Sequence, residues 1–249
     1  MKNEIQLFFT ALTFFTRIPC AGWGKHSEQD LNHSTKYFPL VGVLVGAVAA
    51  VVFMLASMIL PSPLAILLSM ATTLLLTGAF HEDGLSDAVD GLGGGWDKEQ
   101  ILTIMKDSRI GNYGAIALLM ALLIKFQTLA YIPAAKLPVV LIVAHSVSRF
   151  ASTILIYTQS YVRENGKAKP LAQNISAGEL LVAALFGLAP LAWLDPRLWW
   201  ALLPLIPVWL WFSHKLKKLL GGYTGDCLGA MQQLCEVTFY LGVAACVSH

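Results

Sequence analysis

The chain has 249 residues, of which 56% are hydrophobic and only 13% are charged, and its mean hydropathy is +0.64. Soluble domains are about 45–50% apolar and about 25% charged, so this composition excludes a soluble enzyme and a disordered chain. Seventeen basic and fifteen acidic residues give a formal net charge of +2, which is too small to attract DNA or RNA. The sequence therefore predicts an integral membrane protein with one domain over residues 1–249.

Apolar segments recur along the chain at lengths near the roughly 20 residues that cross a bilayer. Residues 5–18 are too few to span and are expected to form an interfacial helix. We predict seven spans after it, at residues 37–60, 64–80, 111–132, 137–158, 178–194, 197–212 and 229–247. The fifth and sixth are short and could instead form one re-entrant pair. Gly42, Gly46 and Ala50 recur at every fourth position of the first span, which favours close helix packing. The predicted fold class is an all-α, polytopic membrane helix bundle.

The basic residues indicate how this bundle lies in the membrane. Successive connections, starting before the first span, contain four, zero, three, one, three, one and three Lys or Arg residues. Basic residues collect on the cytoplasmic side of a membrane. We therefore expect a cytoplasmic N-terminus and an outer C-terminus. The long polar connections 81–110, 159–177 and 213–228 then share the cytosolic face.

The first of these connections begins with a stripe of acidic residues. Asp83, Asp87 and Asp90 are spaced i, i+4, i+7, so on a helix they fall within about 60° of one another. Carboxylates on one stripe repel each other unless a cation lies among them, and hard oxygen ligands suit Mg²⁺. We predict that these residues and the neighbouring Glu82 bind Mg²⁺. The alternative is a solvated acidic helix end.

Two features that follow this acidic stripe suit a phosphorylated substrate. Gly93 and Gly94 would let the backbone approach a ligand closely, although they could simply end a helix. At the cytosolic entry to the third span, Lys106, Ser108 and Arg109 could bind phosphate oxygens. The alternative for the basic pair is a positively charged membrane anchor.

The third polar stretch, residues 221–229, leads into the last span and contains Thr224 and Asp226. Glu236 lies about two turns into the apolar region, where an ionisable group is a functional candidate by default. The alternative is a carboxylate paired with Arg149 or another buried base. Arg149 itself could bind a substrate phosphate or an inner carboxylate. Lys125 lies nearer the outer end of the third span and is expected to snorkel to the interface.

Taken together, these stretches resemble the cobalamin synthase family, the adenosylcobinamide-GDP ribazoletransferases. The resemblance rests on Phe15-Thr16-Arg17-Ile18-Pro19, His81-Glu82-Asp83-Gly84-Leu85-Ser86-Asp87-x-x-Asp90-Gly91, Met105-Lys106-Asp107-Ser108-Arg109-Ile110-Gly111-x-Tyr113-Gly114 and Gly221-Gly222-x-Thr224-Gly225-Asp226-x-Leu228-Gly229-Ala230. It implies a multi-pass inner-membrane enzyme that requires Mg²⁺. Such an enzyme joins adenosylcobinamide-GDP to α-ribazole or its 5'-phosphate and releases GMP.

That reaction needs a base that accepts the proton of the attacking ribose hydroxyl, and positively charged groups around the diphosphate. A carboxylate that binds metal is a poor proton acceptor, so Asp226 is the expected base. Asp107 is the second candidate, although Lys106 and Arg109 would hold it as a paired anion. Asp90 is expected to serve the catalytic step as well as the metal. Thr224 is expected to bind substrate.

Other functions stay open at this point. Intramembrane prenyltransferases and CDP-alcohol phosphotransferases also use aspartate motifs with Mg²⁺-bound diphosphates, and the product distinguishes the three classes: GMP, pyrophosphate or CMP. A cation or metabolite transporter would place its carboxylates nearer the bilayer midplane. The partners we expect are small molecules and lipid but no nucleic acid. A homo-oligomer and complexes with other corrinoid-pathway enzymes stay open.

Overall fold

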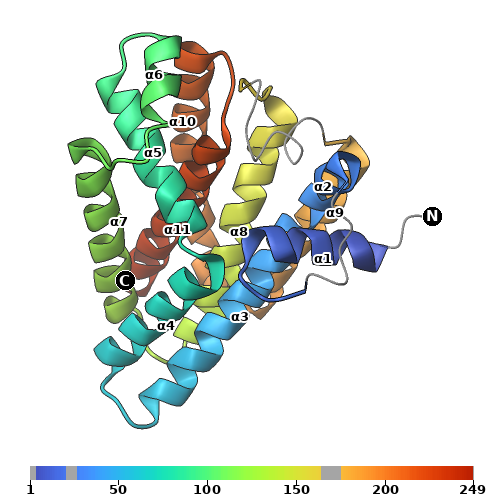
Figure 1. The fold of residues 1–249 in the computed structure, drawn as a ribbon. Helices are drawn as coiled ribbons and strands as arrows, with labels where there is room; N and C mark the ends of the chain where they lie inside the picture. The colour runs from blue at the N-terminus through green and yellow to red at the C-terminus, as the bar shows by residue number, and fades with distance from the viewer. Residues whose placement is uncertain (1–3, 21–26, 164–174, 249) are drawn as a thin grey trace.

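The computed structural model describes residues 4–20, 27–163 and 175–248, and every regular element within these ranges is a helix (Figure 1). The α-helices are α1 (Glu4–Phe15), α2 (Glu28–Ser34), α3 (Phe38–Ser57), α4 (Ser62–Thr77), α5 (Phe80–Gly94), α6 (Lys98–Ile104), α7 (Asn112–Tyr131), α8 (Leu137–Thr158), α9 (Ala177–Leu188), α10 (Leu205–Leu220) and α11 (Gly225–Val247). Three 3₁₀ helices complete the set: η1 (Thr35–Tyr37), η3 (Ala189–Trp193) and η4 (Pro196–Leu202). The predicted all-α class is confirmed.

Four helical runs in the described part of the chain are long and apolar enough to cross a membrane: Gln29–Ser57, Asn112–Tyr131, Leu137–Thr158 and Gly225–Val247. A fifth arises if α4 and α5 are taken as one broken span. The predicted membrane bundle therefore stands, and the count of seven spans remains a prediction. The sixth predicted span, 197–212, differs from the structure, which has η4, a break before Leu205 and then α10. Pro204 lies at this break and cannot donate the backbone hydrogen bond that would continue the helix.

The break between α4 and α5 sets the direction of the acidic segment. The two helices meet at 83°. Gly78 and Ala79 both have left-handed backbone conformations, with φ of 66° and 55°. An L-residue in this conformation costs roughly 1–2 kcal/mol, so Ala79 is strained. The chain thereby leaves α4 sharply and directs α5 across the bundle towards α11, against which α5 packs.

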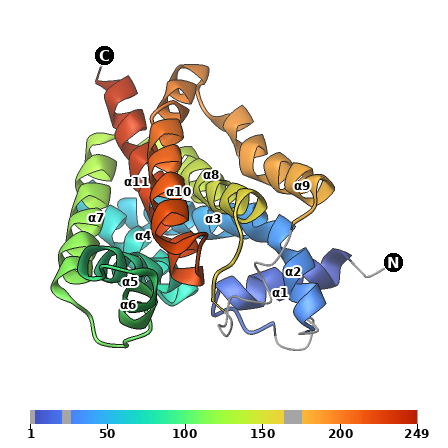
Figure 2. The ribbon, with the colours of Figure 1, turned by 90° about the horizontal axis from the view of Figure 1, so that it is seen from above.

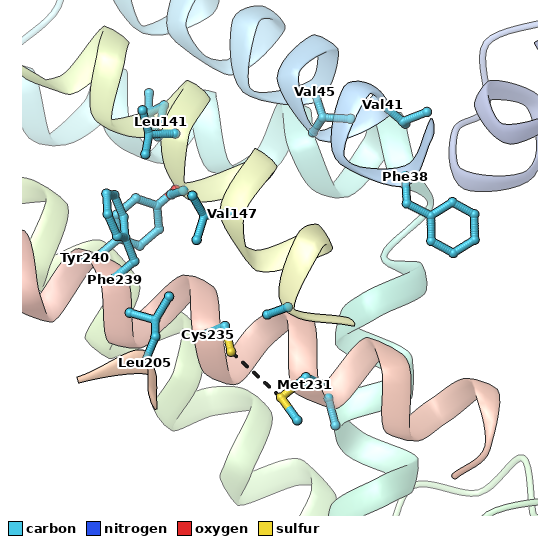
Figure 3. Close-up of a cluster of buried hydrophobic side chains, with 14 of the residues drawn as sticks. Phe38, Val41, Val45, Leu141, Val147, Leu205, Met231, Cys235, Phe239 and Tyr240 are labelled. Carbon is cyan, nitrogen blue, oxygen red and sulfur yellow. Dashed lines mark hydrogen bonds between the residues drawn. The ribbon is translucent and has the colours of Figure 1, made fainter. Parts of the chain in front are cut away.

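The core lies where α3, α8 and α11 meet. Figure 3 shows Val41 and Val45 of α3, Leu141 and Val147 of α8, and Phe239 of α11 within one buried cluster. The small-residue row on α3 makes the contact with α8 possible. A side chain on Gly42 would overlap the carbonyl oxygen of His145, and one on Gly46 would lie 2.6 Å from the Cα of Ile142. The predicted packing surface on the first span is confirmed.

The remaining helices flank this centre. Viewed from above, α7 and α9 lie on opposite sides, with α3, α8 and α11 between them (Figure 2). Large apolar side chains on the outer helices are exposed, among them Ile116 of α7, Leu181 of α9 and Trp211 of α10. Apolar side chains that face outward suit a lipid environment, since hydrocarbon is as apolar as they are.

Candidate active site

The segment that follows α8 and the third polar stretch, residues 221–229, meet through the backbone at one end of the bundle. Figure 1 places α6, the end of α8 and the end of α10 together at its upper end. The amide of Tyr223 donates to the carbonyl of Ser160, and the amide of Val162 donates to the carbonyl of Tyr223, each at 3.0 Å. The side chain of Thr224 accepts from the amide of Cys227 and caps α11. These contacts fix the segment after α8 beside the start of α11.

Three carboxylates come together where α5 crosses α11. A Cβ added to Gly84 would lie 3.0 Å from the carbonyl oxygen of Asp226, which is tighter than ordinary contact, so the glycine favours this close approach. The close crossing brings the negative charges of Asp83 and Asp226 near enough to repel a charge on Asp87. Asp83 is exposed, and Asp87 and Asp226 are half-buried. We call Asp83, Asp87 and Asp226 the acidic cluster.

One cation lies beside the acidic cluster. Nη2 of Arg163 is 2.8 Å from Oδ2 of Asp226, and the Arg163 side chain is only 12% exposed. Its Nε has no hydrogen-bond partner in the described part of the chain. Sequence reasoning missed this residue because its basic connection was assigned only to membrane orientation. The cluster thus combines three carboxylates with one guanidinium that keeps an unused donor.

Asp90, the third member of the predicted stripe, has a different role in the structure. Oδ2 of Asp90 accepts from the amide of Gly111 at 2.7 Å, and Oδ1 accepts from the amide of Gly114 at 2.8 Å. Both amides lie in the first turn of α7, where backbone donors lack helical partners. Asp90 is 8% exposed. Its carboxylate therefore caps α7, and although its charge also repels one on Asp87, both of its oxygens are already bound to these amides.

The second polar stretch is exposed. Nη2 of Arg109 donates to Oδ2 of Asp107 at 2.7 Å, and Lys106 and Ser108 are also at the surface. The Arg109 guanidinium lowers the pKa of Asp107 to about 2. The predicted pairing of Asp107 is confirmed as far as Arg109 is concerned, and it makes this carboxylate a weak base.

The predicted glycines of this region lie at the exposed end of α5. A Cβ on Gly93 would be 3.1 Å from the ring of Tyr113, so this glycine lets α7 pack against α5. One on Gly94 would make ordinary contact with Ile104 at 3.5 Å. The structure thus gives Gly93 a packing role and leaves Gly94 open.

A buried polar network lies beneath this end of the bundle. Nζ of Lys125 is 2.9 Å from Oε1 of Glu236 and 3.0 Å from Oε1 of Gln233. Gln233 in turn donates to Oε1 of Glu82 at 2.8 Å. Lys125 is only 6% exposed, so the prediction that it snorkels to the interface is wrong. Two buried carboxylates attract it inward, and hydropathy alone does not show on which side of a span a lysine points.

The same network includes α8. Nδ1 of His145 is 3.4 Å from Oε2 of Glu236, and Nη1 of Arg149 donates to the carbonyl of His145 at 3.0 Å. Glu236 is therefore paired with a buried base, as one of the two alternatives held, and that base is Lys125 rather than Arg149. Glu82 belongs to this network at 7% exposure, away from the surface where we expected it to bind metal.

A metal ion has to be judged against these positions. No three Asp, Glu, His or Cys side chains in the described ranges form a group that could hold a metal by themselves. Mg²⁺ usually keeps several waters and binds only one or two carboxylates together with substrate phosphates. The acidic cluster offers oxygen ligands of that kind, with more negative than positive charge. It suits a Mg²⁺ ion that arrives with a diphosphate better than a resident ion in a preformed cage.

Comparison with known proteins gives a consistent result. Residues 7–244 match the family model described as cobalamin-5-phosphate synthase. The chain is 44% identical over 252 residues to the adenosylcobinamide-GDP ribazoletransferase of Shewanella frigidimarina, covering 98% of this chain and 95% of that protein. It is 46% identical over 253 residues to the protein of the same name from Shewanella oneidensis, covering 96% and 93%. No solved structure matches.

Proposed function

The chain belongs to the cobalamin-5-phosphate synthase family, and we propose that it joins adenosylcobinamide-GDP to α-ribazole or its 5'-phosphate and releases GMP. The observation that carries the proposal is the acidic cluster with Arg163 at its edge. A diphosphate needs both positive charge and a metal-binding surface, and this site offers a guanidinium beside carboxylates. The protein would work at the cytosolic face of the inner membrane, with its N-terminus in the cytosol.

The reaction is a substitution at phosphorus. A ribose hydroxyl of the ribazole attacks the phosphorus that is bonded to the cobinamide side chain, and a new O–P bond forms. The bond from that phosphorus to the bridging oxygen of the diphosphate breaks, and the bridging oxygen leaves with GMP. The hydroxyl proton passes to a protein carboxylate. Such a transfer depends mainly on positioning and on charge stabilisation.

We assign the proton to Asp226. It is half-buried at the entry to α11, and the negative charge of Asp83 acts on it. In the absence of substrate, Arg163 pairs with its Oδ2. An incoming diphosphate would compete for this guanidinium, and its unused Nε–H would add a second donor. Asp107 is a poorer base because Arg109 stabilises its charged form.

Asp83 and Asp87 would hold Mg²⁺ with the diphosphate. When bound, the ion supplies positive charge that offsets the charge developing on the phosphate oxygens. Because these carboxylates repel one another, a bound cation would stabilise the cluster. Lys106, Ser108 and Arg109 are exposed just after Met105, whose sulfur lies 3.9 Å from the Thr224 hydroxyl, and they would attract the phosphorylated substrate. Thr224 would act indirectly, because its side chain caps the helix that carries Asp226.

The test uses the full-length protein purified in detergent or nanodiscs. It is incubated with adenosylcobinamide-GDP, α-ribazole 5'-phosphate and Mg²⁺, and the expected result is GMP with a corrinoid of the joined mass. Omitting either substrate should abolish GMP release, since the transfer needs an acceptor. Release of pyrophosphate or CMP from other substrates, with no GMP from this pair, would contradict the proposal.

A further inference from the structure

A cavity lies next to the acidic cluster, among α1, α3, α5, α8 and α11. It has about 470 Å³ of empty space when its open mouth is counted, so a ligand would occupy the mouth as well as the interior. Half of its lining residues carry aromatic rings, and the residues on which the argument depends are Phe14, Phe15, Phe38, Phe80, His81 and Arg149. Figure 1 shows α1 crossing α3 in this part of the molecule, so the interfacial helix supplies one wall.

The aromatic rings of the walls are held by contacts with one another. The rings of Phe15 and His81 are stacked, with an interplanar angle of 18° and centroids 5.9 Å apart. Phe14 and Phe80 meet edge to face at 5.5 Å, and Phe15 and Phe38 do so at 4.1 Å. Aromatic pairs prefer such geometries. The cavity therefore presents ring faces and edges, which suit a flat aromatic ligand.

Its polar groups are few. Arg149 is 4% exposed, and its Nη1 is occupied by His145, but its Nε has no hydrogen-bond partner in the described residues. A buried donor without a partner costs folding free energy, so a ligand that accepts a hydrogen bond from this N–H would be bound favourably. Ser152 also lines the cavity, but its hydroxyl already donates to the carbonyl of Leu228 at 2.9 Å. Arg149 thus brings an unpaired, buried donor to the wall of the cavity.

We propose that this cavity binds the base of the ribazole, an inference that rests on the proposed function. That base is a dimethylbenzimidazole: flat, methylated, without an N–H, and with one ring nitrogen free to accept a hydrogen bond. That ring nitrogen is a suitable acceptor for the unpaired Nε–H of Arg149. Guanine would bring several donors and acceptors into an apolar site and leave most of them unpaired. The corrin ring is much larger than the enclosed space.

The position of the cavity agrees with this assignment. Gly225 and Gly229 line it, and they lie on either side of Asp226 in the first turn of α11. A base inside the cavity would have its ribose near the start of α11, the helix that carries Asp226. The two substrates would approach the reacting phosphorus from different sides, the base from the aromatic cavity and the diphosphate from Arg163.

The experiment measures KM for the ribazole and KM for adenosylcobinamide-GDP separately. We expect Phe14→Leu to raise the ribazole KM up to about 10-fold, because an aromatic contact is lost. Arg149→Lys should raise it about 10–100-fold, because the positive charge stays but the Nε donor is lost. Neither substitution should change KM for adenosylcobinamide-GDP. Phe8→Leu is the matched control, since Phe8 is another half-buried phenylalanine of α1 that does not line the cavity.

A second measurement does not depend on variants that fold. Binding of 1,5,6-trimethylbenzimidazole to the wild-type protein is followed by equilibrium dialysis, and we expect it to compete with the ribazole and not with adenosylcobinamide-GDP. A ribazole KM unchanged in active Phe14 and Arg149 variants would overturn the inference, as would a change confined to the other substrate. Failure of the proposed function looks different: the wild-type protein then releases no GMP at all.

Discussion

The two charged regions of this protein, the buried network and the acidic cluster, differ in their balance of negative and positive charges. The buried network has two carboxylates, Glu82 and Glu236, and two cations, Lys125 and Arg149, all less than 9% exposed. The acidic cluster has three carboxylates and one cation, Arg163, and it is open to solvent at Asp83. A buried charge is tolerated only when it is paired, whereas an unbalanced site can gain by binding an ion of opposite charge. The comparison assigns a structural role to the pairing of Lys125 with Glu236 and ligand binding to the acidic cluster.

The largest expected effect is on turnover at the acidic cluster. Asp226→Asn removes the proposed base and keeps the shape of the side chain. Turnover should fall about 10²–10⁴-fold, because general-base catalysis contributes that much. The Mg²⁺ concentration for half-maximal activity should stay nearly unchanged, measured as GMP release at varied Mg²⁺. If saturating Mg²⁺ restores turnover instead, Asp226 is a metal ligand.

The matched variant is Asp87→Asn in the same cluster. Removing one of three repelling carboxylates should leave the folded protein at least as stable as the wild type. The Mg²⁺ requirement should rise, because one of the proposed ligands has gone. Thermal unfolding in detergent and the Mg²⁺ titration check the two parts. A clear loss of stability would place Asp87 with the structural charges and break the comparison.

A substitution in the buried network should lower the stability of the folded protein, unlike Asp87→Asn in the acidic cluster. Glu236→Gln removes the nearer of the two carboxylates beside Lys125 and leaves Glu82 at 4.0 Å, and breaking a buried ion pair typically costs about 3–5 kcal/mol of folding stability. The measurement is the free energy of unfolding in mixed micelles. The double variant Lys125→Met, Glu236→Leu is the control, because removing both charges together should cost less than removing one. Equal losses in the single and double variants would mean that the ion pair is not what stabilises this region.

Asp90 tests where the boundary between the two regions lies. Asp90→Ala removes the acceptor of two amides at the start of α7, and losing a helix cap costs about 0.5–2 kcal/mol. We expect lower stability and no change in the Mg²⁺ requirement per folded molecule. Asp97→Ala, which removes the cap of the exposed helix α6, is the control. A raised Mg²⁺ requirement with unchanged stability would return Asp90 to the metal site that its spacing predicts.

The sequence predicts the fold well where hydropathy governs it. The predicted spans 111–132 and 137–158 agree closely with Asn112–Tyr131 and Leu137–Thr158, because both apolar runs end at turn residues. It does not predict the turn into α5, which depends on a strained left-handed Ala79. Nor does it predict that 197–212 is interrupted, since the segment is apolar throughout and only Pro204 marks the break.

The site is predictable only in part, for a physical reason. Helical spacing places Asp83 and Asp87 on neighbouring turns, but it cannot show that Asp90 is drawn to two amides more than twenty residues away. The pairing of Arg163 with Asp226 joins residues still farther apart. Local pattern gives the residue types and their periodicity. The partner of each charge depends on which helices cross, here at glycines such as Gly84.

The smallest expected effect is at Asp107. Arg109 lowers the pKa of this carboxyl to about 2, so it is charged throughout the pH range in which the protein can be assayed. Any stability from this ion pair is present above the ordinary pKa of an aspartate and is lost only as the pH falls towards 2. Asp107→Asn should therefore change turnover less than about threefold, since the pair is exposed and such pairs contribute little. The profile of kcat against pH between 5 and 9 should keep its shape. A profile that loses its acidic limb in Asp107→Asn, but not in Asp226→Asn, would exchange the roles of the two residues.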